Sequence, residues 1–85
     1  MDNNISVGFL RKKEVIKLLG TSKSTFYNRI NDGLFTKPIS IGERAVGFPS
    51  NEVRTIINHL IAGRSDCQIR ELVINLHNDR ALLAL

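Results

Sequence analysis

A short interval between two helical patterns, from Gly20 to Ser22, most constrains what this chain can fold into. Glycine often ends a helix and serine caps the start of the next one, so the interval leaves room only for a tight turn. Apolar residues recur at helical spacing on both sides of the turn: Val15, Leu18 and Leu19 before it, Phe26 and Ile30 after it. The pattern predicts a helix-turn-helix over residues of about 9 to 35.

A change to alternating apolar residues after the second helix predicts a β-hairpin. Its strands are expected at residues 38–41 and 45–48, with Gly42-Glu43-Arg44 as the turn. Ser50 then caps a third helix that runs to about Ala62. The apolar stripe of this helix is expected to cover the first two helices and the hairpin, and it consists of Val53, Ile56, Ile57, Leu60 and Ile61.

These elements divide the chain into three parts. Residues 1–7 are expected to be a flexible N-terminus, and residues 8–63 a mainly α domain with a small β-hairpin wing. Residues 64–85 repeat an amphipathic pattern and predict a C-terminal helix. The tail from Ala81 to Leu85 is too apolar for a solvated terminus, so residues 66–85 either pack back on the domain or form a homodimer with another copy. The sequence leaves both alternatives open.

The positive charge of the chain is localised. Residues 9–37 hold seven basic and two acidic side chains, a net charge of +5, whereas the formal charge of the whole chain is +4. A local basic cluster is typical of a phosphate-binding surface, and it is also found as an ordinary solvated face.

The second helix of a helix-turn-helix that binds DNA lies in the major groove, so its exposed face must be polar. With Phe26 and Ile30 directed inward, four side chains point outward and three flank that face: Ser24, Thr25, Asn28 and Asn31, then Lys23, Tyr27 and Arg29. Hydroxyl groups suit phosphate oxygens, asparagine pairs with adenine, and arginine or lysine pairs with guanine or phosphate. Tyr27 is interpreted as a phosphate contact. The alternative is that all seven are capping and solvent-facing residues of a surface helix.

Two further cations lie near the predicted hairpin. Arg44 is expected at its tip, where a long cation reaches phosphates or a narrow minor groove. Lys37 lies just before its first strand. The alternative for Arg44 is that it pairs with Glu43 or only keeps the turn soluble, and Lys37 carries the same ambiguity.

The sequence favours no catalytic, metal or cofactor site. It lacks a nucleophile beside a base, a paired carboxylate site and a glycine-rich phosphate loop, so we expect no enzyme and no cofactor. Cys67 is expected as a buried small side chain, and His59 and His77 as packing or surface residues, without zinc spacing. No apolar run reaches the roughly 20 residues of a membrane span, and no secretory signal is visible, so a cytoplasmic protein is expected.

Several motifs together resemble the AlpA family of phage and genomic-island regulators over residues of about 8 to 62. They include Phe9-Leu10-Arg11, Lys13-Glu14-Val15, Gly20, Ser22 to Tyr27, Gly33, Phe35, Pro38, Gly42 to Phe48 and Glu52-Val53. The resemblance implies a MerR-like winged helix-turn-helix that acts as a transcriptional regulator or as an excisionase that steers an integrase. It carries DNA contacts over to residues Ser22 to Arg29 and to Arg44. Phe48 stands where the family often has tryptophan.

Two functions of different class therefore remain. The first is a sequence-specific regulator of a prophage or genomic island with double-stranded DNA as its partner, and with an integrase or RNA polymerase as further candidates. The second is a protein-binding adaptor that uses the apolar C-terminal helix.

Overall fold

The first two helices form as the glycine and serine signals indicate. The computed structural model describes residues 8–83, so the expected flexibility of residues 1–7 and the end of the apolar tail lie outside the described residues. Helix α1 (Lys12–Leu19) ends at Gly20, whose φ of 66° is left-handed. Helix α2 (Lys23–Asn31) begins after Ser22. The predicted helix-turn-helix is confirmed.

The inward face of α1 differs by one residue from the expected one. Val15 is fully buried, but Leu18 is 59% exposed, and Ile16 packs against the core together with Leu19. Successive helix positions are about 100° apart, so Ile16 and Leu19 both lie on the side of Val15 that faces the core, while Leu18 lies on the other side. The predicted helical spacing in α1 is therefore right, but the prediction that Leu18 faces the core is wrong.

The hairpin belongs to a three-stranded antiparallel sheet. Strand β2 (Ile39–Gly42) and strand β3 (Ala45–Pro49) form the predicted hairpin, and β1 (Phe9–Leu10) pairs along the other edge of β3, which gives the order β1-β3-β2. Phe9 lies opposite Pro49. Two hydrogen bonds extend this pairing: the Gly8 N–H donates to Ser50 Oγ over 3.0 Å, and the Ser50 N–H donates to the Gly8 carbonyl over 2.8 Å. The short segment before α1 thus forms a third strand, which the sequence analysis does not predict.

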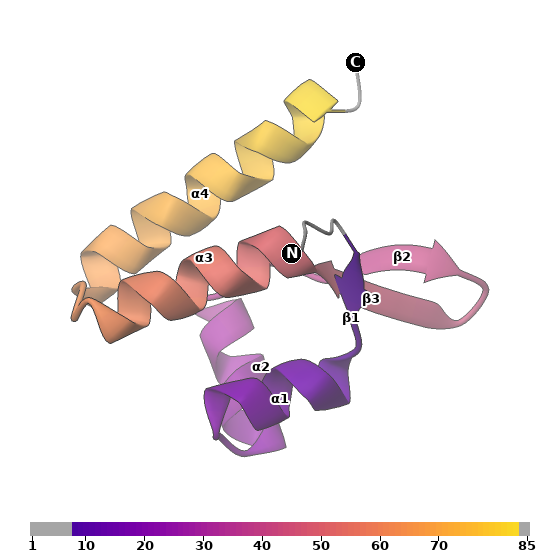
Figure 1. The fold of residues 1–85 in the computed structure, drawn as a ribbon, viewed down its shortest axis with the longest axis horizontal. Helices are drawn as coiled ribbons and strands as arrows, with labels where there is room; N and C mark the ends of the chain where they lie inside the picture. Colours follow the sequence, from indigo (N-terminus) through magenta and orange to yellow (C-terminus); the bar gives the residue numbers. More distant parts are fainter. Residues whose placement is uncertain (1–7, 84–85) are drawn as a thin grey trace, which may run out of the picture.

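Helix α3 (Ser50–Ile61) covers the helix-turn-helix as expected (Figure 1). Val53 and Ile56 are buried, and Ile57 and Leu60 pack against the core. Ile61 is 78% exposed, because it lies five residues beyond Ile56 and therefore on the opposite side of the helix. The predicted stripe is right except for its last residue.

Helix α4 (Asp66–Leu83) runs back alongside α3 (Figure 1). It starts with a reciprocal cap, in which the Gln68 N–H donates to Ser65 Oγ over 3.2 Å and the Ser65 N–H donates to Gln68 Oε1 over 2.9 Å. Ile69 is fully buried and Val73 is 3% exposed, and both belong to the common core. Cys67, expected to be buried, is exposed, because it lies in the first turn of α4 on the side away from the core.

The predicted fold class is confirmed: a mainly α chain with a small β-hairpin wing forms a winged helix-turn-helix, and a C-terminal helix completes it. The structure shows α4 packing against the rest of the chain through Ile69, Leu72, Val73 and Leu76, whereas Ala81 and Leu82 of the apolar tail are exposed. A contact of this helix with a second copy stays a prediction.

Candidate nucleic-acid interface

The turn between α1 and α2 is held by its own hydrogen bonds. The Gly20 N–H donates to the carbonyls of Ile16 and Lys17, over 3.0 and 3.2 Å. Ser22 caps α2, since its Oγ accepts the Thr25 N–H over 3.1 Å and donates to Thr25 Oγ1 over 2.9 Å. The hydroxyl groups of Ser22 and Thr25 therefore support the start of the helix, and each still has acceptor capacity toward solvent.

Most of the predicted contact residues share one exposed surface. On α2 and its cap these are Ser22, Lys23, Ser24, Thr25, Tyr27, Asn28 and Asn31. Phe26 points the other way and is fully buried. The polar face of α2 is thus presented to solvent by a helix whose opposite face lies in the core.

Arg29 is less exposed than the other predicted contact residues of α2. It is half-buried, and its Nε is enclosed without a hydrogen-bond partner among the described residues. A hollow of about 130 Å³ beside it is lined by Leu19 and Thr21 of the turn region and by Leu60 of α3. Arg29 therefore lies at the edge of the α2 surface, beside Leu60 of α3, in the flanking position expected from the helical period.

A lysine that the sequence analysis did not single out supports Tyr27. Lys12, at the start of α1, donates from Nζ to Tyr27 Oη, and the same Nζ lies 5.1 Å from the centre of the tyrosine ring. The hydrogen bond from Lys12 is the largest effect and lowers the pKa of Tyr27; burial opposes it, and the charges of Lys12 and Lys23 lower the pKa further by smaller amounts. Lys12 was visible only as one member of the basic cluster, because a contact between α1 and α2 has no signal in sequence spacing.

Three phenylalanines hold α2 against the wing. Phe26 of α2 has its ring centre 5.2 Å from that of Phe35 and 5.4 Å from that of Phe48 in β3, and Phe35 and Phe48 are 5.8 Å apart. All three are buried, and all three pairs are edge-to-face, an arrangement that favours one fixed geometry. The core therefore holds α2 close to strand β3.

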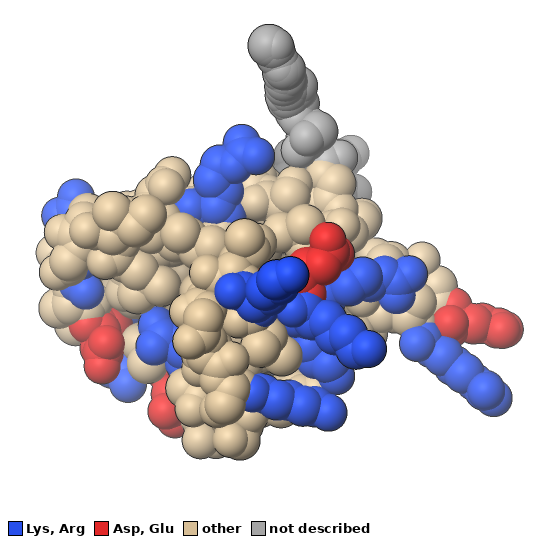
Figure 2. Space-filling model, turned by 60° about the horizontal axis from the view of Figure 1, so that its bottom comes forward, with Lys and Arg blue, Asp and Glu red and all other residues tan. Residues whose placement is uncertain are grey.

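The hairpin tip carries the predicted arginine. Arg44 is exposed and adopts a left-handed φ of 58° in the turn between β2 and β3, next to Glu43. Lys37 is also exposed, two residues before β2. Figure 2, which brings the α1 and α2 side forward, shows basic side chains gathered across that face, with basic and acidic side chains together at the hairpin tip. The positive charge of this face favours the binding of a polyanion.

Over residues 8–83, no group of three or more His, Cys, Asp or Glu side chains is placed to hold a metal ion. None of the helices described is long and apolar enough to cross a membrane.

The profile of the family described as prophage CP4-57 regulatory protein (AlpA) matches residues 8–60 of the chain. The chain is also 41% identical over 56 residues to an uncharacterized protein, ORF88, of Enterobacteria phage P4. The matched segment covers 66% of this chain and 64% of that relative, slightly less than two thirds of its length. No solved structure matches the chain. The family match confirms the resemblance seen in the motifs: the chain belongs to the AlpA family of prophage regulatory proteins.

Proposed function

We propose that this chain is a sequence-specific DNA-binding regulator of a prophage or genomic island, with α2 in the major groove and the hairpin tip against the flanking backbone or minor groove. One observation carries the proposal: an exposed, uncharged-polar and basic face of α2 is held beside the wing by the buried cluster of Phe26, Phe35 and Phe48. A fixed spacing between a groove-reading helix and a second basic element is what sequence-specific seating requires.

The side chains of α2 have distinct chemistry in this arrangement. Asn28 is the proposed base-reading residue, since its amide pairs with adenine in the major groove. Lys23 suits guanine or phosphate, and Ser22, Ser24, Thr25 and Tyr27 suit phosphate oxygens. Lys12 donates to Tyr27 and adds positive charge beside that hydroxyl. Arg44 and Lys37 are proposed to contact the backbone beside the groove, and Arg29 to contribute from the edge of the helix.

The test is a titration on duplex DNA. A preferred sequence is first selected from a library of random duplexes, and binding of that duplex is then measured at several salt concentrations, because each phosphate contact steepens the salt dependence. Asn28→Ala is expected to weaken binding by ~1–3 kcal/mol and to relax the preference at one base pair. Arg44→Ala should reduce the salt slope by about one.

Two variants serve as matched controls. Asn75→Ala, at an exposed position of α4, and Arg64→Ala, in the exposed turn after α3, should both leave affinity unchanged. Absence of duplex binding at low salt would overturn the proposal. Equal effects of Asn28→Ala and Asn75→Ala would overturn the placement of α2 in the groove.

Transcriptional control and excision need the same seating on DNA and differ in what is recruited. The proposal includes both functions: RNA polymerase would be the recruited partner in transcriptional control, and an integrase in excision. An excision assay and a promoter-reporter assay, both in cells that express a phage integrase, separate them.

Association through the C-terminal helix is a second candidate, as a homodimer through residues 66–85 or as an adaptor for another protein. Its support is the exposure of two apolar side chains of α4, Ile74 at 59% and Leu82 at 67%. Ile69 and Val73 are in the core and unavailable. Sedimentation equilibrium of the full chain and of its Ile74→Glu variant tests the homodimer. If residues 66–85 form a homodimer, the wild type has the mass of a dimer and the variant has the mass of a monomer.

A further inference from the structure

Helix α4 lies beyond residues 8–60, the segment matched by the family profile, yet it binds the chain that joins α2 to the wing. We call residues 32–38 the linker. At its start, Arg70 Nε donates to the Asp32 carbonyl over 2.9 Å. Near its end, the Lys37 N–H donates to His77 Nε2 over 3.1 Å, and Arg80 Nη2 donates to the Lys37 carbonyl over 2.8 Å. Both ends of the linker are thus bound by side chains of one helix.

The three polar side chains share one side of α4. Arg70, His77 and Arg80 are seven and three residues apart, spacings that bring side chains to neighbouring positions on a helix. Val73 lies between them along this side and is buried in the core. The stem of Arg70 also passes Gly33, where its Cγ lies 3.8 Å from the place of a Cβ. Helix α4 therefore follows the linker from Asp32 to Lys37.

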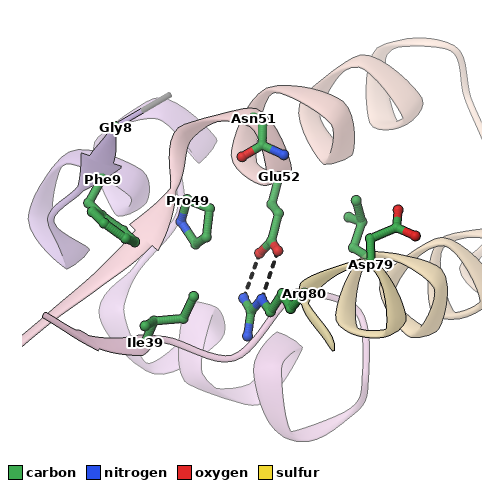
Figure 3. A pocket seen from close by; sticks show the side chains of 9 residues that line it. Gly8, Phe9, Ile39, Pro49, Asn51, Glu52, Asp79 and Arg80 are labelled. Carbon is green, nitrogen blue, oxygen red and sulfur yellow. Dashed lines mark hydrogen bonds and ion pairs between the residues drawn. The ribbon is translucent and has the colours of Figure 1, made fainter. Parts of the chain in front are cut away.

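Arg80 is itself held in place. Its Nε donates to Glu52 Oε2 over 2.7 Å, and its Nη2 donates to Glu52 Oε1. Glu52 is 3% exposed and lies in the first turn of α3, and Figure 3 shows its carboxylate paired with the Arg80 guanidinium group. Because Arg80 also donates to the Lys37 carbonyl, this group joins α3, α4 and the linker. An arginine with a bidentate carboxylate partner has little rotational freedom, so the Lys37 carbonyl receives a donor of defined position.

We infer that α4 is a positioning element for the wing, in which Arg70, His77 and Arg80 hold the linker and so set the angle between β2–β3 and α2. The hydrogen bonds to Lys37 act two residues before β2 begins, and the bond to Asp32 acts just after α2 ends. A shift at either point rotates the hairpin relative to the exposed face of α2. The part of this inference that concerns DNA rests on the proposed function, whereas the geometric part does not.

The geometric part is tested on the free full-length protein. Residual dipolar couplings of backbone N–H groups in α2 and in β2–β3 are expected to fit one alignment tensor in the wild type. In His77→Phe and Arg70→Ala the couplings of the hairpin should shrink relative to those of α2. His77→Gln, whose amide oxygen accepts a hydrogen bond as the imidazole does, should restore the hairpin couplings.

The controls are the same changes at positions away from the linker, His59→Phe in α3 and Arg64→Ala in the turn after it. Unfolding midpoints by circular dichroism confirm that each variant is folded under the conditions of measurement. If the hairpin couplings of His77→Phe and Arg70→Ala equal those of the wild type, the inference is wrong.

The functional part is a double-mutant cycle with Arg44→Ala on the selected duplex. If α4 acts through the wing, His77→Phe weakens binding about 2- to 10-fold in the wild type and has no further effect when Arg44 is already alanine. Additive losses would show that His77 does not act through the hairpin tip. If the wild type binds no duplex, the proposed function fails, and the dipolar couplings alone decide whether α4 positions the wing.

Discussion

The ion pair between Glu52 and Arg80 gives a quantitative test of how strongly α4 is built into the fold. The Glu52 side chain is 4% exposed and the Arg80 side chain 23% exposed. Arg80→Met leaves the Glu52 carboxylate buried without its partner, which typically costs ~3–5 kcal/mol. Because Arg80 is partly open to water, we expect the lower end, ~3 kcal/mol, and a fall in the thermal midpoint of ~12–24 °C for a domain of this size.

The double variant Glu52→Met/Arg80→Met separates the energetic cost of an unpaired buried carboxylate from the cost of changed packing. It removes the unpaired carboxylate, and it still loses the hydrogen bond from Arg80 to the Lys37 carbonyl, so we expect it to be only about 1 kcal/mol less stable than the wild type. Urea unfolding followed by circular dichroism measures all three proteins, with Arg64→Met as an exposed control expected to change stability by less than ~0.5 kcal/mol. The reasoning is refuted if Arg80→Met loses less than ~1 kcal/mol, or if the double variant is no more stable than Arg80→Met alone.

Three further predictions concern stability. Phe26→Ala should cost ~3–5 kcal/mol in urea unfolding, because Phe26 is fully buried in contact with two other rings, and a loss below ~1 kcal/mol would contradict this packing. Thr36→Val should raise stability by ~1 kcal/mol, since the fully buried Thr36 hydroxyl has no hydrogen-bond partner among the described residues; a less stable variant would show that the hydroxyl is bonded. Burial, followed by the charge of Arg80, lowers the pKa of His77 below its ordinary value of 6.5, despite the opposing effect of Glu52 and with a further contribution from Lys37. The unfolded chain then binds the proton more readily, so this contribution to stability is present above pH 6.5 and is lost as the pH falls through the lowered pKa. Urea unfolding between neutral and mildly acidic pH should show a smaller loss for His77→Gln than for the wild type, and equal losses would contradict it.

The helix-turn-helix and the hairpin were predictable because their signals are local. Gly20 ends α1 through its own backbone conformation, and Ser22 caps α2 through a residue three positions away. The alternation of apolar residues likewise determines the hairpin over a few neighbours. The surface of α2 followed from the helical period alone, once Phe26 was placed inside.

What the sequence did not reveal depends on contacts between distant segments. Strand β1 has two residues, too few to show alternation, and it is defined by its pairing with β3. The enclosure of Arg29 depends on the approach of Leu60 from α3, and the partner of Tyr27 comes from α1. The polar residues on the inward side of α4 were the one available signal for its contacts, since Arg70, His77 and Arg80 interrupt an otherwise apolar side.

The hydrogen bonds between Gly8 and Ser50 also bear on the order in which the chain folds. They join residues 42 positions apart, so closing this loop costs ~3 kcal/mol of chain entropy before any contact is gained. The helix-turn-helix and the β2–β3 hairpin rest on contacts between near neighbours and need no such closure. We therefore expect β1 to dock late in folding and to detach first in native-state opening. While it is detached, the outer edge of β3 is unpaired and is the place where strand pairing with another chain begins.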